Sequence, residues 1–308
     1  MTSSVHAESA GPSCRLLHVY MNKMDIYLKF SRIVLEIKLF RELSIEESYH
    51  PFIVPPTAPD VKILVSGDWE SCRKPSAQPI GEDLLHFYYS EDGYRFCELR
   101  GGIKGPISYA VYTDDYSEIL CSINEPAYEL GTLSLSLLLR MLPMCSIFTH
   151  FNTIFLHSSQ IAYRGKGILF SAPSGTGKTT QAKLWQSVCG ADIICNDRTL
   201  IRKVNGVWQT YRYPLDGSEP CHGNYIFPLQ TIVYLKQGTI NRVTRLKLQK
   251  TVSLLMSQMV IDHWDSIVRE KSFQMLLEIF GDIPVYELVC TPDPCAVTEL
   301  KRELERGI

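Results

Sequence analysis

One stretch of the chain has residue types and spacing suited to binding phosphate groups. Residues 171–185 read SAPSGTGKTTQAKLW. Counting back from Lys178 gives Ala172-x-x-x-x-Gly177-Lys178-Thr179, the phosphate-loop (Walker A) pattern with alanine in place of its first glycine. A strand-like GILFS precedes the loop, and TTQAKLWQSV follows it with helical spacing. The stretch therefore predicts a nucleotide-binding loop between a strand and a helix.

The polar residues of this loop each have a chemical task under that interpretation. Gly175 and Gly177 allow the backbone to curl, so that several N–H groups converge on phosphate oxygens while the new helix adds its positive end. Lys178 is expected to reach the β- and γ-phosphates, and Thr179 is placed to offer its hydroxyl to Mg²⁺. The alternative is a Gly/Ser turn before a helix that merely contains a lysine. The strand-loop-helix order favours nucleotide binding.

Two residues close to the loop in sequence could complete a site. Asp197 follows Lys178 by 19 residues and ends the apolar run IIC, so its carboxylate is predicted at the carboxyl end of a strand, where ligands bind in open α/β sheets. It could hold a metal ion or act as a base, and the alternative is an Asx turn. His157 precedes Lys178 by 21 residues and ends the run TIFL; taken alone, it is more typical of a structural histidine.

The elements that must position these residues belong to an α/β half that begins near Glu129. A leucine-rich buried helix is expected to end near Pro143, and Ala182, Trp185 and Val188 are expected to share the buried face of the helix after the loop. Residues 251–268 are interpreted as a core helix followed by a loop, with His263 and Trp264 in packing roles. Strands are predicted in 153–163, 167–172, 191–201, 206–213, 231–237 and 284–290, and further helices in 250–259, 272–280 and 294–305.

The first half of the chain is rich in strand patterns. Strands are predicted for 61–66, 84–90, 94–100 and 109–113, with turns such as SEDG between them. The predicted organisation is a disordered tail over 1–20, a strand-rich α+β N-terminal domain over 21–128 and the loop-bearing domain over 129–308. Met21 or Met24 could be the true start.

Composition excludes several classes of partner and location. The 31 basic and 33 acidic side chains give a formal charge of −2, so no general attraction to nucleic acid or to an anionic membrane is expected. The ten cysteines form no C-x-x-C pair, which favours reduced thiols in a cytoplasmic protein. Residues 1–20 lack the apolar run of a secretory signal. The most apolar stretch, 132–148, carries Arg140 and Pro143 and is shorter than the roughly 20 residues of a membrane span.

The joint spacing of FLHSSQIAYRGKGILFSAPSGTGKTT and IICNDR resembles the catalytic domain of HPr kinase/phosphorylase, and still more the broader HPr-kinase-like group. The resemblance covers 151–300 and implies a phosphate-loop kinase fold related to phosphoenolpyruvate carboxykinase, with ATP and Mg²⁺ used to phosphorylate serine hydroxyls. Residue by residue, it implies that Ser174, Gly175, Thr176, Gly177, Lys178, Thr179 and Thr180 hold the nucleotide. Asp197 would be the base or metal partner and His157 the histidine beside the phosphates. Because HPr kinases form hexamers, it also implies self-association.

The chain departs from that family at informative places. Asn196 stands where the HPr enzyme has the first of two adjacent aspartates, which puts a metal or proton-handling role of the pair in doubt. The glycine-rich signature associated with HPr docking is not recognisable, so neither HPr as substrate nor phosphorolysis is expected. Arg198 could stabilise charge on the transferring phosphoryl group, or be a surface ion-pair partner. Arg212, His222 and Arg242 lie in segments that could border the acceptor.

These observations predict an ATP- and Mg²⁺-dependent kinase that transfers a phosphoryl group to a serine-type hydroxyl on a peptide or a small molecule. The rival from another class is a nucleotide-binding regulatory or peptide-recognition module with little or no turnover, which the amide at Asn196 would suit. In that case the strand-rich half could hold a peptide at an open sheet edge. The short interval between the loop and Asp197 disfavours a simple ATPase.

Overall fold

A computed structural model describes residues 24–83, 85–101, 105–125, 133–214 and 223–306. The chain forms two compact units. The first unit holds residues up to Leu28 together with Val34–Ser44 and Val54–Pro143, and the second holds Lys29–Ile33, Ile45–Ile53 and the chain from Met144 onward. The predicted tail 1–20 and the predicted boundary between residues 128 and 129 lie outside the described residues.

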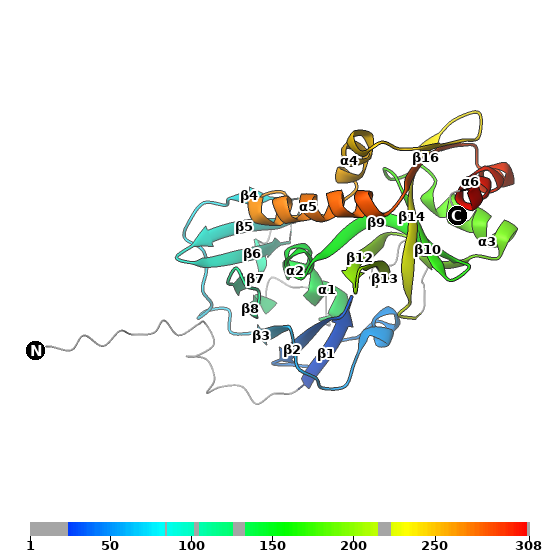
Figure 1. The fold of residues 1–308 in the computed structure, drawn as a ribbon. Coiled ribbons are helices and arrows are strands. Elements are labelled where there is room, and N and C mark those ends of the chain that lie inside the picture. Colours follow the sequence, from blue (N-terminus) through cyan, green and yellow to red (C-terminus); the bar gives the residue numbers. More distant parts are fainter. Residues whose placement is uncertain (1–23, 84, 102–104, 126–132, 215–222, 307–308) are drawn as a thin grey trace, which may run out of the picture. The chain divides into compact units, whose positions relative to one another are not determined.

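An eight-stranded sheet makes up most of the first unit, and its blue to blue-green arrows can be followed in Figure 1. Its spatial order is β1-β2-β3-β8-β7-β6-β5-β4. The turn SEDG joins β5 to β6 with Asp92 and Gly93 at positive φ, the type I′ geometry that fits the twist of a hairpin. The strands are β1 (Met24–Phe30), β2 (Ile33–Leu39), β3 (Val61–Ser66), β4 (Gly81–Glu82), β5 (His86–Glu91), β6 (Tyr94–Arg100), β7 (Pro106–Tyr112) and β8 (Glu118–Ile123).

The hairpin of β1 and β2 has no individual counterpart among the predicted strands, and its turn explains why. Ser31 and Arg32 occupy the turn with φ of 50° and 71°, so the turn carries none of the Asn-Gly or Asp-Gly signal that usually marks this geometry. Bonds within the second unit hold it: the carbonyl of Ser31 accepts from Arg202 Nη1 at 2.7 Å. Tertiary contacts therefore stabilise a turn whose own sequence does not predict it.

The leucine-rich stretch forms two short helices. Helix α1 (Leu135–Arg140) begins at Ser134, whose hydroxyl accepts from the amide of Leu137, and α2 (Met144–His150) follows Pro143. A proline has no amide hydrogen and clashes with the preceding turn, so it cannot lie inside one continuous helix. Of the helices in the described part of the chain, none is both long and apolar enough to cross a membrane.

Two long strands, β9 (Thr153–Tyr163) and β14 (Ile226–Gln237), organise the second unit. Their pairings give the order β10-β9-β12-β13-β14-β16-β15, and β10 also pairs with β14, which closes a ring of five strands. Gly167 on β10 is required by this closure, because a Cβ there would lie 2.8 Å from Thr210 Oγ1 on β13. The other strands are β10 (Lys166–Ser171), β11 (Asp192–Cys195), β12 (Arg198–Val204), β13 (Val207–Arg212), β15 (Arg242–Arg245) and β16 (Val285–Cys290).

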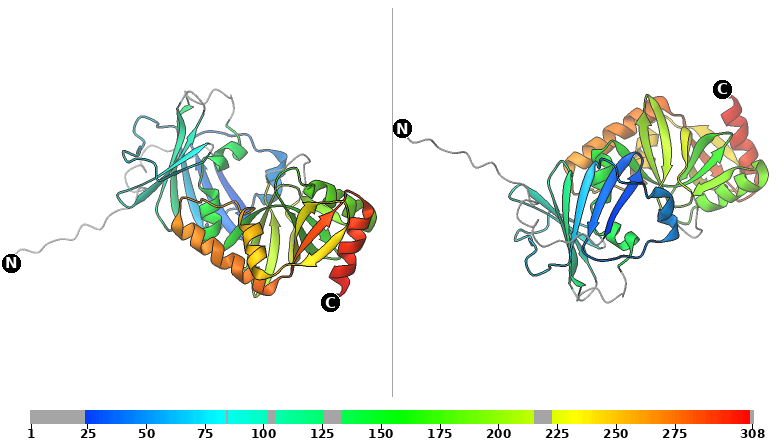
Figure 2. Two further views of the ribbon diagram at one scale, coloured as in Figure 1. Left: turned by 90° about the horizontal axis from the view of Figure 1, so that it is seen from above. Right: turned by 90° about the horizontal axis from the view of Figure 1, so that it is seen from below.

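Helices cover both faces of this sheet, as Figures 1 and 2 show. Helices α3 (Lys178–Cys189) and α6 (Pro294–Arg306) pack around the buried Trp185, whereas α4 (Leu248–Met256) and α5 (Ser266–Asp282) cover the other face. Ala182 and Trp185 are fully buried as predicted, but Val188 is 46% exposed, because Cys189 continues the buried stripe at that turn. Helix α5 begins six residues earlier than predicted, since Asp265 caps it by accepting from the amides of Ile267 and Val268.

Strands β10, β14 and β16 run parallel, so their carboxyl ends meet at one edge of the sheet. The loop that follows β10 lies at this edge, beside the end of β14, because Gln237 Nε2 donates to the carbonyl of Gly175 at 3.3 Å. Helix α3 is tied to the end of β16 by Gln181 Nε2, which lies 3.3 Å from Cys290 Sγ. Such an edge is where α/β sheets bind ligands.

Candidate functional site

Three segments far apart in sequence meet at the middle of β9. There the strand changes partners on both sides: Ser171 at the end of β10 pairs with Ser158, whereas Arg198 at the start of β12 pairs with His157. The turn between β11 and β12 is fixed by the amide of Ser158, which donates to the carbonyl of Asp197 at 2.9 Å. The third segment, residues 257–261, bonds to β9 just beyond the end of β10. The change of partners brings the predicted loop, Asp197 and His157 together.

The loop has the backbone that its glycines were predicted to allow. Gly175 and Gly177 have φ of 77° and 112°, and no atom lies within 4 Å of a Cβ built on either, so the backbone angle rather than crowding favours glycine. Helix α3 starts directly after Gly177 with no side-chain cap and no acidic residue in its first turn. The first amides of a helix have no partner within the helix, and this end is therefore suited to an anion.

Lys178 is the first residue of α3 and is only 7% exposed. Its Nζ donates to the carbonyls of Ala172 and Pro173 at 2.8 and 3.3 Å. Burial lowers the pKa of Lys178, and the negative charge of Asp197 opposes that shift. The ammonium group is thus held inside the loop, close enough to Asp197 for their charges to interact. Of the other predicted loop residues, Thr176 and Thr179 are half-buried, whereas Ser174 and Thr180 are exposed.

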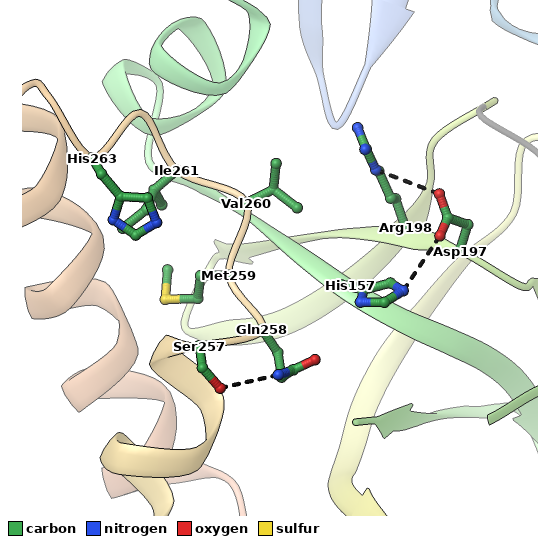
Figure 3. Close-up of a pocket in the computed structure, with 9 residues that line it drawn as sticks. All are labelled: His157, Asp197, Arg198, Ser257, Gln258, Met259, Val260, Ile261 and His263. Atoms are coloured by element: carbon green, nitrogen blue, oxygen red, sulfur yellow. Dashed lines mark hydrogen bonds and ion pairs between the residues drawn. The ribbon is translucent and has the colours of Figure 1, made fainter. Parts of the chain in front are cut away.

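Asp197 lies between two basic side chains. Its Oδ1 is 3.4 Å from His157 Nε2 and its Oδ2 is 3.4 Å from Arg198 Nε, as the dashed lines in Figure 3 show. Both distances exceed the optimum for a charge-assisted hydrogen bond, so the carboxylate keeps the capacity to accept a further donor. About one third of the Asp197 side chain, 35%, is exposed. The guanidinium of Arg198 also lies over the ring of Phe155, 5.5 Å from its centre.

His157 stands within β9 rather than at its end, and its surroundings set its charge. Burial lowers the pKa of His157, the positive charges of Lys178 and Arg198 lower it further, and Asp197 together with a hydrogen bond to the Gln258 side chain oppose the shift. Because the unperturbed value is about 6.5, the imidazole is neutral near pH 7. A neutral ring beside a carboxylate can orient it without cancelling its charge.

A cavity of about 350 Å³ opens beside these residues. Its lining is drawn in Figure 3 and consists of His157, Asp197, Arg198, Ser257, Gln258, Met259, Val260, Ile261 and His263. The sequence pointed to the first three, but it did not point to the segment after α4. His263, expected in a packing role, is exposed and lines the cavity. No periodicity or motif marks this segment, since its place depends on pairing with β9 about 100 residues earlier.

Asn196, the departure from the resembled family, is buried beside Asp197. It is 7% exposed, and neither atom of its amide has a hydrogen-bond partner. Its backbone carbonyl accepts from Ser159 Oγ at 3.3 Å, so the main chain of the turn is anchored although the side chain is not. A buried amide without partners costs stability, and such groups in native proteins call for an explanation.

The other residues named from sequence do not join this cluster. Arg212 is completely buried, where its Nη1 donates to the carbonyl of Gly223 at 3.1 Å and its guanidinium lies over Phe52. Arg242 is exposed on β15. His222 lies outside the described residues. Arg198, considered for the transferring phosphoryl group, lines the cavity, whereas Arg212 and Arg242 are not among its lining residues.

Comparison with known families identifies the chain by sequence. The model of a family described as "SynChlorMet cassette protein ScmC" matches residues 119–304, more than half of the 308 residues. The chain belongs to this family. The matched stretch runs from β8 into α6 and includes His157, Asn196, Asp197, the loop and the segment 257–263.

Two further comparisons complete the picture. No curated protein matches the chain. Among solved structures, the HPr(Ser) kinase/phosphatase from Coxiella burnetii is similar with a TM-score of 0.29 and 9% sequence identity, over 49% of this chain and 91% of that chain. The fold of the ScmC-family chain is mixed α/β with two multi-stranded sheets.

Proposed function

We propose that the protein is an ATP- and Mg²⁺-dependent kinase that transfers the γ-phosphoryl group to a hydroxyl on a peptide or small molecule, on a phosphate-loop fold of the HPr-kinase type. One observation carries the proposal: Lys178 opens a helix whose amino end has no cap of its own, and its ammonium group lies close enough to Asp197 and His157 for electrostatic interaction. Phosphoryl transfer depends mainly on positioning and charge neutralisation, which this arrangement can supply.

The residues present fit a nucleotide with its metal ion. The open turn 174–177 and the first amides of α3 would hold the phosphates, with Lys178 balancing their charge. Among the described residues no three His, Cys, Asp or Glu side chains gather to hold a metal ion by themselves. Mg²⁺ commonly uses one or two protein ligands together with substrate phosphates, and Thr179 and Asp197 would serve here. The ion would supply neutralisation of phosphate charge.

Asp197 is the residue best placed to act on the acceptor. Its carboxylate lines the cavity and has room for another hydrogen bond, so it can accept the proton of an acceptor hydroxyl as that oxygen bonds to phosphorus and ADP departs. His157 holds Oδ1 from one side as a neutral ring, and Arg198 holds Oδ2 from the other. Arg198 is also positioned to balance charge on the transferring group.

The decisive experiment follows label from γ-labelled ATP in the presence of Mg²⁺, with candidate acceptors that include peptides encoded beside the gene. The description of the family as a cassette protein supports that choice of peptides. In Lys178→Ala, transfer and the rise in melting temperature caused by ATP should both disappear while the circular dichroism spectrum stays native. Lys183→Ala, an exposed lysine on the same helix, is the matched control. Unchanged turnover in Lys178→Ala would defeat the proposal.

Asp197→Asn separates the two roles of the carboxylate. If Asp197 is the base, the variant keeps the ATP-dependent rise in melting temperature and loses transfer. If the variant loses ATP binding instead, Asp197 is chiefly a metal ligand.

We further propose that the enzyme works in the cytoplasm, self-associates, and binds neither nucleic acid nor membranes.

One observation favours the second candidate, a nucleotide-binding module with little turnover. Asn196 places a neutral, unpartnered amide where the resembled kinases have a carboxylate. ATP consumption that does not depend on any acceptor, or binding without consumption, would support this module.

A further inference from the structure

We propose that the phosphoryl acceptor is a peptide, bound in an extended conformation along residues 257–263 with its hydroxyl at Asp197. This assignment rests on the proposed kinase activity, and it selects between the two acceptor classes that the site residues alone leave open. It comes from the shape and composition of the cavity next to Asp197.

One wall of the cavity is a continuous run of chain. Ser257 to Ile261 line it without a gap, and His263 extends the same wall. The opposite wall consists of His157, Asp197 and Arg198, which Figure 3 shows across from the segment. Ser257 and Gln258 form the turn after α4, and the chain from Met259 to Ile261 then follows β9, to which Met259 is bridged in antiparallel orientation. A wall of successive residues that follows a strand in this way forms a groove parallel to the segment. This shape suits another extended chain better than a compact molecule.

The groove is open to solvent along its charged wall. The side chains of His157, Asp197 and Arg198 remain 28%, 35% and 36% exposed. Sites for small molecules usually enclose most of the ligand surface, and their volumes begin at about 300 Å³. This cavity has a volume of about 350 Å³, near that lower limit, and it is not enclosed. An acceptor that fills an open groove of this size would continue beyond it, as a peptide does on both sides of its serine or threonine.

Backbone hydrogen bonds to β9 fix the position of the wall. The carbonyl of Gln258 accepts from the amide of His157, and the amide of Val260 donates to the carbonyl of Phe155, at 2.9 and 2.8 Å. Met259 and Ile261 are 6% and 8% exposed, packed in the core that includes α5 residues. Side chains alternate along an extended segment, so Val260 lies on the other side, toward Arg198, where Figure 3 shows it.

Val260 is therefore the residue that an extended acceptor would contact beside its hydroxyl. It is half-buried and apolar, and the wall that it faces consists of His157, Asp197 and Arg198. Enlarging it should obstruct a peptide that passes through the groove. Val260→Trp makes this change, and Val207→Trp is the matched control because Val207 is 47% exposed at the start of β13.

The test compares two probes at equal hydroxyl concentration with γ-labelled ATP: acetylated, amidated pentapeptides of degenerate sequence around a central serine, and N-acetylserinamide. The pentapeptides should be phosphorylated with kcat/KM at least about tenfold higher, because remote contacts contribute to positioning of the hydroxyl. Val260→Trp should remove that advantage, and the rise in melting temperature with ATP should remain. Val260→Ala, which cannot obstruct the groove, guards against misfolding of the larger variant and should keep most of the advantage.

A second readout does not depend on turnover. With a non-hydrolysable ATP analogue present, millimolar pentapeptides should slow amide hydrogen exchange across 257–263, and N-acetylserinamide should not. Equal rates for the two probes, label on neither probe with ATP binding intact, or unchanged peptide phosphorylation in Val260→Trp would each overturn the peptide assignment. If ATP fails to raise the melting temperature of the wild-type protein, the kinase itself is refuted and the acceptor assignment falls with it.

Discussion

Replacing Asn196 by leucine should stabilise the folded protein, although the residue adjoins the candidate active site. Asn196 is 7% exposed and neither amide atom has a partner, so folding removed both from water without compensation. Leucine has nearly the same shape and carries no polar atom. The bonds that anchor this turn, from Ser159 Oγ to the carbonyl of Asn196 and from the amide of Ser158 to that of Asp197, involve only its main-chain carbonyls.

The expected gain follows from the two unpartnered atoms. Each buried polar group left without a bond costs about 1–3 kcal/mol, so removing both should raise the free energy of unfolding by about 2 kcal/mol or more. For a cooperative unit of about 150–250 residues, 1 kcal/mol shifts the melting temperature by about 2–4 °C. The length of the second unit, most of which is the continuous stretch from Met144 onward, falls in this range. The melting temperature of Asn196→Leu should therefore rise by about 4–8 °C.

Scanning calorimetry without nucleotide measures this shift. Gln258→Leu is the matched control, since Gln258 is equally buried at 7% but its Nε2 donates to Ser257 Oγ at 3.0 Å and its side chain bonds to His157. That substitution breaks existing bonds and should lower the melting temperature. A melting temperature for Asn196→Leu at or below the wild-type value would refute the reasoning. If the variant is stabilised and also loses its response to ATP, the amide sacrifices stability for ligand binding.

Two further predictions concern the loop and the sheet edge. Gly177→Ala forces a side chain onto a residue at φ 112°, which costs about 1–3 kcal/mol, and it should abolish the thermal shift with ATP; Gly206→Ala, at φ 80° in the β12–β13 turn, should cost stability and leave that shift intact. Burial favours the protonated form of Glu287, but bonds from Lys236 and Lys250 outweigh it and lower its pKa. A lowered pKa in the folded state stabilises the protein at pH values above the unfolded pKa of about 4.5. This stabilisation is lost as the pH falls through the folded-state pKa. Glu287→Gln should therefore melt below wild type at pH 7, and the difference in melting temperature should vanish in acid; a difference that persists there would contradict the ion-pair interpretation.

Local signals made several parts of the fold predictable. Strands β3 and β6 and the β5–β6 turn follow alternation and a positive-φ Asp-Gly pair, and the strand-loop-helix around Lys178 follows glycines and helical spacing. The helix break at Pro143 also follows from one residue. Each of these features depends on the conformational limits of residues within a few positions of one another. The β1–β2 hairpin was not predicted as such, because its turn residues, Ser31 and Arg32, are held by contacts with residues distant in sequence.

The sequence by itself determined the loop, its lysine and an aspartate at the end of a strand, because each of these features depends only on residues close together in the chain. Only the tertiary structure decided that His157 faces that aspartate, that Gln258 bonds to His157, and that Val260 and His263 line a groove beside them. Those placements arise where β9 exchanges one set of partners for another, and pairing between strands separated by 40 to 100 residues leaves no local pattern. The physical reason is that strand pairing is selected by the whole packed core, whereas turns and caps are selected by their own few dihedral angles.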